Sequence, residues 1–535
     1  MSDVIRHGKI PLVIGTAGHS EIRDEDREAL RKSVRQELKK LREQCPHTSV
    51  VMLSALEPGS DLLCADMAEE TGISLWAVLP EDRALYEKRF LPEERALLLH
   101  HLARAEKVYT AAAAETPQDQ ADSRDRYRQT GIHIAEHCHI LLALWNGTEN
   151  TADCGTAATV GFALHGSWQP ARGTASRSAE NAAVIHVLTP CREDGTAENA
   201  GEIRVLGNLE AMEAILKKTE EFNTLAEGTE EGEPLLSGES GTDRGLREME
   251  ALYHTADRLS MRYAGEYRRM LGGLAVTGIL LTLAFLLYDE SNMIPMILVC
   301  GAALITAYML SGKAERSACH RRYIEFRALA ETVRVQIFLR YAGSRIETQR
   351  LMTWTQQRET AWILCAVCAA NAEASPEKKR EIRGCWAEEQ QRYHQKARKR
   401  NGRKKERNDK LVRVILLCTV AVYTATLLME LLCGGLIFRP AAELKNIDLM
   451  RTVMKILLGT LSAGTLFLTS YYGKLNVERQ TSDHEKMEVF FRIMSERLAE
   501  QGQTESLLET LAREELAENG NWCSYRRDQK PELDF

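Results

Sequence analysis

The chain has 535 residues, a net charge of −7 and 27% charged side chains, so its composition gives no sign of nucleic-acid binding and we expect no nucleic-acid partner. Its 13 cysteines are scattered rather than spaced as a disulfide framework, which favours a reducing compartment. The apolar N-terminal stretch is too short for a secretory signal peptide. This length predicts roughly two to four domains.

The first part of the chain, up to about residue 190, alternates short apolar runs with helical stretches. Apolar strands without strict alternation are typical of a parallel sheet that is covered on both faces. The predicted fold is therefore α/β, a doubly wound, Rossmann-like parallel sheet. Strands are predicted over 10–15, 49–56, 73–80, 137–147 and 182–190, with helices over 24–44, 61–72 and 155–166.

The second half contains four long apolar stretches. Residues 226–245 are acidic and rich in Gly and Ser, which predicts a flexible linker. Each apolar stretch is long enough to cross a hydrocarbon core of about 30 Å. The alternative is that they are buried core helices of a large soluble protein. We expect an all-α membrane domain with additional cytoplasmic helices and spans at 271–288, 293–310, 414–438 and 453–472.

The helical half is predicted to contain the same unit twice. Tyr-His pairs at 253–254 and 393–394 precede the first and third spans by similar distances, and Gly-Lys pairs follow the second and fourth spans. The expected domains are a sheet domain at 1–225, the linker at 226–245 and two-span modules at 246–390 and 391–535. Paired units of this kind favour a homo-oligomer.

Charges flanking the spans predict their orientation. The strongly basic run Lys396–Lys410 precedes the third span, whereas the tip of the first hairpin, residues 289–292, is acidic. The positive-inside tendency therefore places both termini in the cytoplasm, in a multi-pass protein of the inner membrane. The basic run also has the charge to attract anionic lipid headgroups, although fixing the topology explains it equally well.

Three loops rich in small residues follow predicted strands and precede predicted helices. The carboxyl ends of parallel strands meet at one edge of a sheet, where helix N-termini favour anions. We therefore expect a nucleotide-derived ligand there, with no cofactor and no metal. The candidate ligand-binding residues are Gly15, Thr16, Ala17, Gly18, His19, Arg23, Ser54, Glu57, Gly59, Ser60, Asp61, Pro80, Trp145, Asn146, Gly147, Gly155 and Thr156. Helix capping by Ser60 or Asp61, and loop bracing by His19, are the alternative roles.

The motifs "GTAGHSEIR", "LSALEPGSDLLCADMAEETGISLWAVLP", "LYEKRF" and "HCHILLALWNGT…CGTAATVGFALHG" together resemble the SLOG superfamily over residues 8–190. This is a Rossmann-like group that includes the LOG phosphoribohydrolases. The resemblance implies ligand phosphates or ribose against 15–19, 57–61 and Gly155-Thr156. LOG enzymes carry a PGGxGTxxE signature, and Thr159 occupies the position of its catalytic glutamate here. A threonine cannot act as that carboxylate, which favours binding without turnover.

The helical half resembles the SLATT group of bacterial membrane modules, through "YIEFRALAETVRVQIFLRYAG" and "LAREELAENGNW". Such modules are proposed pore-forming or membrane-disrupting effectors of antiviral conflict systems. Four spans exceed their usual two, which tandem modules would explain. Within the spans, Glu430 and Lys455 are candidates for lining a cation pathway or pairing with each other. A position of Glu430 at the membrane interface is the alternative.

The sequence thus predicts a membrane effector gated by a nucleotide-derived signal, pore-forming or membrane-disrupting, in bacterial antiphage defence. Adenosine diphosphate ribose-like molecules, cyclic nucleotides and NAD-related compounds are all compatible with the loops. Two other functions remain open: a membrane-anchored, LOG-like nucleotide hydrolase, for which acids such as Glu57, Asp61 and Asp153 are available, and a non-conducting assembly scaffold.

Overall fold

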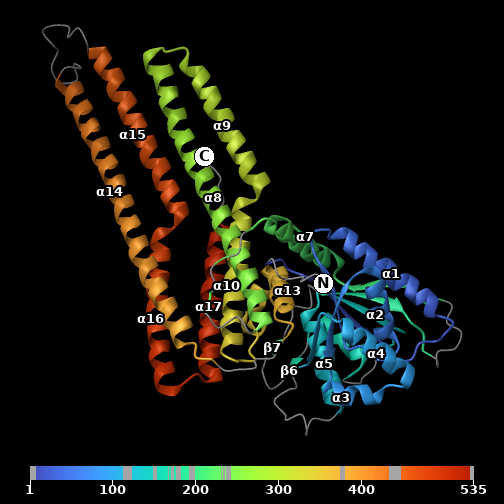
Figure 1. The fold of residues 1–535 in the computed structure, drawn as a ribbon. Helices are drawn as coiled ribbons and strands as arrows, with labels where there is room; N and C mark the ends of the chain where they lie inside the picture. The colour runs from blue at the N-terminus through green and yellow to red at the C-terminus, as the bar shows by residue number, and fades with distance from the viewer. Residues whose placement is uncertain are drawn as a thin grey trace. The chain divides into compact units, whose positions relative to one another are not determined.

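The structure is a computed structural model whose chain is drawn in Figure 1. It describes residues 8–111, 123–148, 154–166, 168–169, 174–175, 182–191, 199–229, 232, 235–236, 243–373, 380–432 and 447–529. The chain forms two compact units. The first contains residues 1–259, 325–382 and 503–520, and the second contains 260–324, 383–502 and 521–535.

A seven-stranded sheet organises the first unit. Its strands are β1 (Leu12–Gly18), β2 (Val50–Ser54), β3 (Ser74–Leu79), β4 (Lys107–Thr110), β5 (Ile140–Trp145), β8 (Ala183–Leu188) and β9 (Ile203–Gly207). Their order is β4-β3-β2-β1-β5-β8-β9, and every pairing is parallel except that of β9 with β8. The predicted α/β class and doubly wound parallel sheet are confirmed. The short strands β6 (Trp168–Gln169) and β7 (Thr174–Ala175) form a separate pair.

The sequence prediction did not include β4 and β9, and both are edge strands of the sheet. β4 has only four residues and begins with a lysine, so it lacks the apolar run of a central strand. β9 is mostly exposed and pairs only with β8, so its sequence does not have to be apolar.

Helices cover both faces of the sheet because successive strand residues point to opposite sides. Leu12 and Ile14 face one core, which α1 (Arg27–Gln44), α2 (Ser60–Thr71), α4 (Pro92–Arg104) and α7 (Leu209–Ala226) complete. Val13 faces the other core, which α5 (Ser123–His137), α6 (Thr156–His165) and α13 (Ala361–Ala370) complete. The short helices α3 (Arg83–Tyr86) and η1 (Glu87–Arg89) precede α4.

The compact units cut across the predicted domain boundaries. Residues 325–382, expected in a membrane module, belong to the unit that contains the sheet, and Ala369 packs in the core of its second face. Within the predicted linker, Leu236 is buried and its N–H donates to Glu250 Oε1 at 2.9 Å. The helices that join the sheet in the first unit are α10 (Cys319–Tyr341) from Glu325 onward, α11 (Thr348–Leu351), α12 (Trp354–Glu359), α13 and the first part of α17 (Glu505–Arg527).

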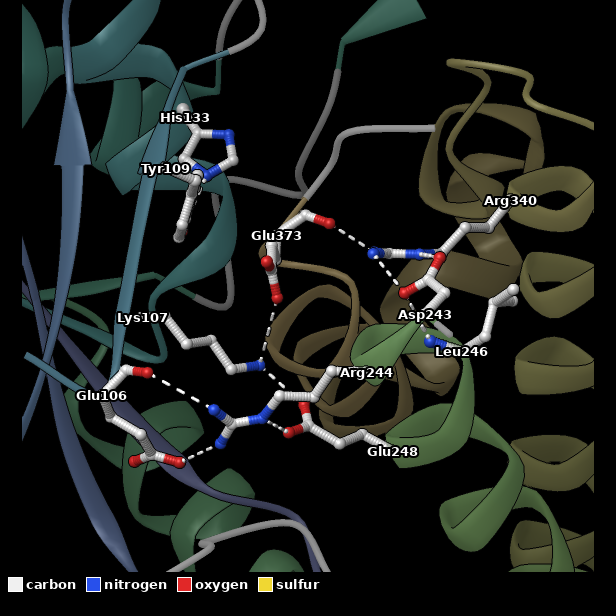
Figure 2. A network of polar contacts seen from close by, with 10 residues as sticks. All are labelled: Glu106, Lys107, Tyr109, His133, Asp243, Arg244, Leu246, Glu248, Arg340 and Glu373. Carbon is white, nitrogen blue, oxygen red and sulfur yellow. Dashed lines mark hydrogen bonds and ion pairs between the residues drawn. The ribbon is translucent and has the colours of Figure 1, made fainter. Parts of the chain in front are cut away.

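Helix α8 (Arg244–Ser291) begins on the sheet, as Figure 2 shows. The ammonium of Lys107 on β4 lies 2.6 Å from Glu248 Oε2, and the two side chains are only 3% and 6% exposed. The same ammonium lies 4.4 Å from the centroid of the Trp76 ring. Arg244 pairs with Glu248 at 2.8 Å and with Glu106 at 2.7 Å. We call Glu106, Lys107, Arg244 and Glu248 the α8 clamp.

Asp243 ties the start of α8 to α10. Its Oδ1 accepts a hydrogen bond from the N–H of Leu246 at 3.2 Å, which caps the helix. The guanidinium of Arg340 on α10 lies 3.1 Å from the same carboxylate and donates to the carbonyl of Glu373 (Figure 2). The first turn of α8 is therefore held by charged groups from both the sheet and the helices that follow.

The second unit contains four helices that are long and apolar enough to cross a membrane, judged by length and composition. They are the later part of α8, α9 (Met296–Ser317), α14 (Glu389–Leu432) and α15 (Ile447–Leu475). These helices include the predicted spans at 271–288 and 453–472 entirely. The end of the third predicted span, from 433 to 438, lies outside the described residues. The π-helical turn η5 (Arg383–Glu388) precedes α14, and α16 (Val477–Gln501) follows α15.

Glycines bring α8 and α15 into close contact. A Cβ at Gly278 would lie 2.5 Å from the ring of Phe467, and a Cβ at Gly459 would lie 2.6 Å from Leu286. Small residues at such crossings are typical of packed apolar helices. Lys455 on α15 also pairs with Glu290 on α8 at 3.0 Å.

Each apolar hairpin is followed by the same kind of helix break. Ala318 separates α9 from α10 with a φ of +46°, and Asn476 separates α15 from α16 with a φ of +48°. In both places the N–H of this residue donates to the carbonyl three residues earlier, Glu315 or Gly473. Two breaks of matching geometry support the repeat that the sequence suggests.

Glu248→Gln should lower the free energy of unfolding of the full chain by about 2–3 kcal/mol, because the buried Lys107 ammonium loses its nearest anion and keeps only the Glu373 carboxylate at 3.9 Å. Urea unfolding of the purified protein measures this change. The exposed neighbour Arg247→Gln is the control and should change stability by less than about 0.5 kcal/mol. A Glu248→Gln protein as stable as the control would contradict the clamp.

Candidate functional site

The strand order fixes where the loops converge. From β1 the chain adds β2, β3 and β4 on one side and then returns to add β5 and β8 on the other, so the strand order reverses between β1 and β5. Ligands of open α/β sheets bind beside the carboxyl ends of strands at such a switch point. The loops after β1, β2 and β5 all leave the sheet here, and the loop after β5 leads to the start of α6. We call this the carboxyl edge.

His19 joins the three loops. Its carbonyl accepts hydrogen bonds from Ser60 N at 3.0 Å and Ser60 Oγ at 2.8 Å, and its own N–H donates to the Leu144 carbonyl at 3.0 Å. Its ring Nε2 accepts from the N–H of Asn146 at 3.0 Å. An accepting Nε2 requires a neutral ring with the proton on Nδ1. The loop-bracing role considered for His19 is therefore present, and its carbonyl occupies the first N–H of α2.

Two of the predicted glycines are needed for these loops to touch. A Cβ at Gly18 would lie 2.3 Å from the Cβ of Ser60. Gly59 has a φ of +75°, and a Cβ there would lie 2.3 Å from the Ser20 carbonyl oxygen. Their first role is thus close packing of backbone on backbone, which also makes the edge rigid.

A cluster of buried polar side chains lies behind the loops. The Thr16 hydroxyl donates to Ser54 Oγ at 2.9 Å, and this oxygen also accepts from the N–H of Leu56 at 3.0 Å. Asp61 is 4% exposed, and its Oδ2 accepts from the N–H of Glu57 at 3.4 Å. Its Oδ1 is buried and has no hydrogen-bond partner among the described residues. Such an orphaned carboxylate oxygen favours a missing donor, such as a ligand hydroxyl.

The two carboxyl groups of this cluster have raised pKa values. Burial, and then the charge of Asp61, raise the pKa of Glu57 to about 8. Burial raises the pKa of Asp61 to about 6, and the polar groups close to it, Thr16 first, offset this rise only in part. Near pH 7, Glu57 therefore holds a proton while Asp61 is largely ionised. Separated pKa values in neighbouring acids are typical of functional sites.

The backbone beside these acids is strained. Leu56 is fully buried and has a φ of +57°, a left-handed conformation that costs a non-glycine residue about 1–2 kcal/mol. Such strain persists only where the surroundings enforce it, and it gathers at ligand sites. This strain could not be predicted from the sequence, because a leucine in a loop carries no turn signal.

The start of α6 is open. Gly155 is exposed with a φ of +93°, and none of the described residues places an atom within 4 Å of the position a Cβ would take. Thr156 is the first residue of the helix and is partly exposed. Thr159 faces away from this end, since its hydroxyl donates to the Gly155 carbonyl at 3.1 Å and lies against Gly131 of α5. The N-terminus of α6 suits an anion better than that of α2.

The remaining predicted residues differ in their surroundings. Arg23 is paired with Asp26 and Glu25, so its charge is already balanced. Trp145 is buried beside the ring of His186, and its Nε1 has no hydrogen-bond partner among the described residues.

Two further predicted positions, Pro80 and Gly15, are buried, and a Cβ at Gly15 would lie 2.9 Å from the Cβ of Cys138, the residue that follows α5. Ala17 is partly buried, whereas Gly147 is exposed with a φ of +80°.

Tyr86 was missed as a site residue, although the quoted motif "LYEKRF" contains it. It is 1% exposed, and its hydroxyl donates to the Ala55 carbonyl at 3.1 Å, in the loop that carries Glu57. Burial and the charge of Glu57 raise the pKa of its phenol well above the ordinary value. It thus packs beneath the strained loop.

The two intramembrane candidates do not pair with each other. Glu430 on α14 pairs with Arg451 on α15, with Oε1 at 2.6 Å from Nε and Oε2 at 2.8 Å from Nη2. Lys455 pairs with Glu290 instead. Arg451 was not singled out because it lies outside the predicted spans.

A scan against models of protein families finds no match for this chain, and a search of curated proteins finds no significant relative.

Glu57→Gln should flatten the pH dependence of stability. The Glu57 carboxyl has a pKa of about 8 in the folded protein and an ordinary pKa of 4.5 in the unfolded chain. The folded state therefore binds the proton more tightly, and stability falls as pH rises between these two values. At pH 9 the variant should be more stable than the parent by on the order of 3 kcal/mol. Urea unfolding at pH 5 and pH 9 tests this.

The control is Glu43→Gln, which removes an exposed carboxylate from α1. It should leave the difference between the two pH values unchanged. If Glu57→Gln behaves in the same way as Glu43→Gln, the raised pKa is wrong.

Proposed function

We propose that this chain is a membrane-embedded effector gated by a nucleotide-derived ligand bound at the carboxyl edge of the sheet. The observation that carries the proposal is helix α8, which begins in the clamp on the sheet and continues without interruption into an apolar stretch long enough to cross a membrane. A ligand that binds two arrangements of the sheet domain with different affinity would shift the state of that helix.

The ligand is proposed from the chemistry of the edge. The open N-terminus of α6 at Thr156 suits a phosphate. The buried Asp61, with one unpartnered oxygen, suits a ribose hydroxyl. ADP-ribose-like molecules, cyclic nucleotides and NAD-related compounds all combine these two groups. The family resemblance points to the same edge.

Helix α5 provides the contact between this edge and the helices beyond the sheet. Its Gly131 lies against Thr159 of α6. At its other end, Glu136 pairs with Arg350 at 2.9 Å, and His137 lies 3.3 Å from Glu347. Burial and the hydrogen bond from His137 act oppositely on Glu347, and its pKa is held well below the ordinary value. A change at α6 therefore reaches a buried ion network through one rigid helix.

The membrane role is proposed from the apolar surface. Leu298 on α9 is 75% exposed, and Leu417 on α14 and Leu466 on α15 are each 68% exposed. Apolar side chains on several long helices need lipid or another copy of the chain to cover them. We propose the inner membrane, cytoplasmic termini and a homo-oligomer in which the hairpins form a pore or disrupt the bilayer. Antiphage defence is proposed on resemblance alone.

A second candidate function is nucleotide hydrolysis at the same edge. Glu57 and Asp61 are neighbouring acids with separated pKa values, one protonated and one ionised near pH 7, as general acid and general base catalysis requires. Conversion of NAD or ADP-ribose by the full chain, and its loss in Asp61→Asn, would favour the hydrolase. Ligand recovered unchanged after prolonged incubation would favour the gated effector.

Thr156→Glu should weaken nucleotide binding at least about tenfold, or 1.4 kcal/mol, because its carboxylate would occupy the anion position. The helix itself should tolerate it, since a negative charge suits the first turn. Thr156→Gln, of similar size but neutral, is the control and should bind far better. Calorimetry with ADP-ribose, NAD and cyclic adenosine monophosphate measures both affinities. Equal affinities would exclude the α6 terminus as the phosphate site.

Arg244→Gln should separate binding from response. It removes the link from α8 to Glu106 but leaves the buried pair of Lys107 and Glu248. We expect nucleotide affinity within about twofold of the parent and dye release from liposomes reduced about tenfold. The control, Arg247→Gln, changes an exposed residue three positions further along α8 and should respond as the parent does. Parent-like release from Arg244→Gln would show that the clamp does not transmit the signal.

A further inference from the structure

The second unit contains a pocket of about 650 Å³ that the proposed function does not use. Its walls come from the ends of the apolar stretches remote from the hairpin tip at 289–292. Tyr267 directly precedes the first stretch, Leu411 precedes the third, and Tyr472 ends the fourth. Tyr323 of α10, a few residues beyond the second hairpin helix, completes it. Its volume suits a small ligand or a lipid headgroup.

The charge of this pocket is entirely positive. Four cations line it, namely Arg268, Lys404, Arg407 and Arg526, and none of its described lining residues is acidic. Among the described residues, no carboxylate forms an ion pair with any of the first three. Burial, and then the charges of Arg400, Arg268 and Arg407, lower the pKa of the Lys404 ammonium. Gathered cations repel one another, so this arrangement favours an anion.

Arg526 carries an unsatisfied donor. It is 5% exposed, and its two terminal nitrogens donate to the carbonyls of Lys474 and Leu475, at 3.2 and 3.0 Å, which caps the end of α15. Its Nε–H is buried and has no hydrogen-bond partner among the described residues. A buried, charged donor without an acceptor is costly, and an anion in the pocket would supply the acceptor.

Tyrosines give the pocket an amphipathic wall. Tyr267 and Tyr323 stack with ring centroids 6.3 Å apart, and Tyr471 and Tyr472 line the pocket at the end of α15. Tyrosine rings gather at the level of lipid headgroups, with an apolar body and a polar tip. Basic pockets between membrane helices on the cytoplasmic side suit phosphate-bearing headgroups.

We infer that this pocket binds a phosphate-bearing anion through Arg268, Lys404, Arg407 and Arg526. An acidic phospholipid headgroup is one source and a free phosphate compound is the other; the lipid source rests on the proposed insertion of the hairpins in a membrane. The site lies within the second unit and contains no residue of the carboxyl edge, so it stands apart from nucleotide binding.

The test uses the full chain in nanodiscs of phosphatidylcholine with phosphatidylglycerol, and native mass spectrometry to count the acidic lipids that stay bound. The exposed pocket cations are changed together in Arg268→Gln, Lys404→Gln and Arg407→Gln, which leaves the helix cap at Arg526 intact. Retention should fall about fivefold for each cation lost. The control variant Lys399→Gln, Arg403→Gln and Lys410→Gln removes equal charge from α14 outside the pocket and should retain the lipid.

A second arm distinguishes the sources. Glycerol 1-phosphate and inorganic phosphate are added to the protein in nanodiscs of phosphatidylcholine alone. Their binding, lost in the pocket variant and kept in the control, would assign the site to a free phosphate compound. Selective retention of phosphatidylglycerol with no binding of the soluble compounds would assign it to lipid. Equal retention by the pocket variant and the control, together with no binding in the second arm, would overturn the inference.

Discussion

The buried pair of Lys107 and Glu248 is the constraint on which the organisation of the chain depends. Neither charge has water to solvate it, so the first turns of α8 must stay on β4 wherever the sheet domain is folded. Because α8 runs on to Ser291 as one helix, its apolar half begins from a fixed base. Asp243 caps the start of α8 and also pairs with Arg340, so α10 is attached to the same fixed start of α8.

The carboxyl edge differs from the clamp because its buried polar groups are not all satisfied. There the loops are rigid, held by His19 and by glycines in contact, but one polar cluster is left incompletely satisfied. Asp61 keeps an unpartnered oxygen, Glu57 keeps a proton, and Leu56 keeps a strained backbone. A protein gains nothing in stability from these features, which fits a site whose partner is a ligand. The fixed base of α8 and this unsatisfied edge belong to the same compact unit.

The sequence predicted the parts of this molecule that have a local signal. Apolar strands such as Leu12–Gly18 and uncharged stretches such as 271–288 follow directly from the periodicity and length of their residues. It did not predict that Ala361–Ala370 packs on the sheet, because a buried apolar helix has the same composition in any domain. Among site residues, the glycines and His19 had a loop signal, whereas Tyr86 and the Leu56 strain depend on tertiary contacts. The partner of Glu430 was missed for the same reason, since Arg451 is nearby only in the folded hairpin.

The central claim is that a nucleotide at the sheet edge changes the state of the membrane helices. The most direct measurement is the current across a planar bilayer containing the full chain, with ADP-ribose, NAD or a cyclic nucleotide added only on the side of the sheet domain. The account predicts a change in current that depends on ligand concentration and disappears in Thr156→Glu but persists in Thr156→Gln. A current that is unaffected by a ligand shown to bind the same preparation would contradict it.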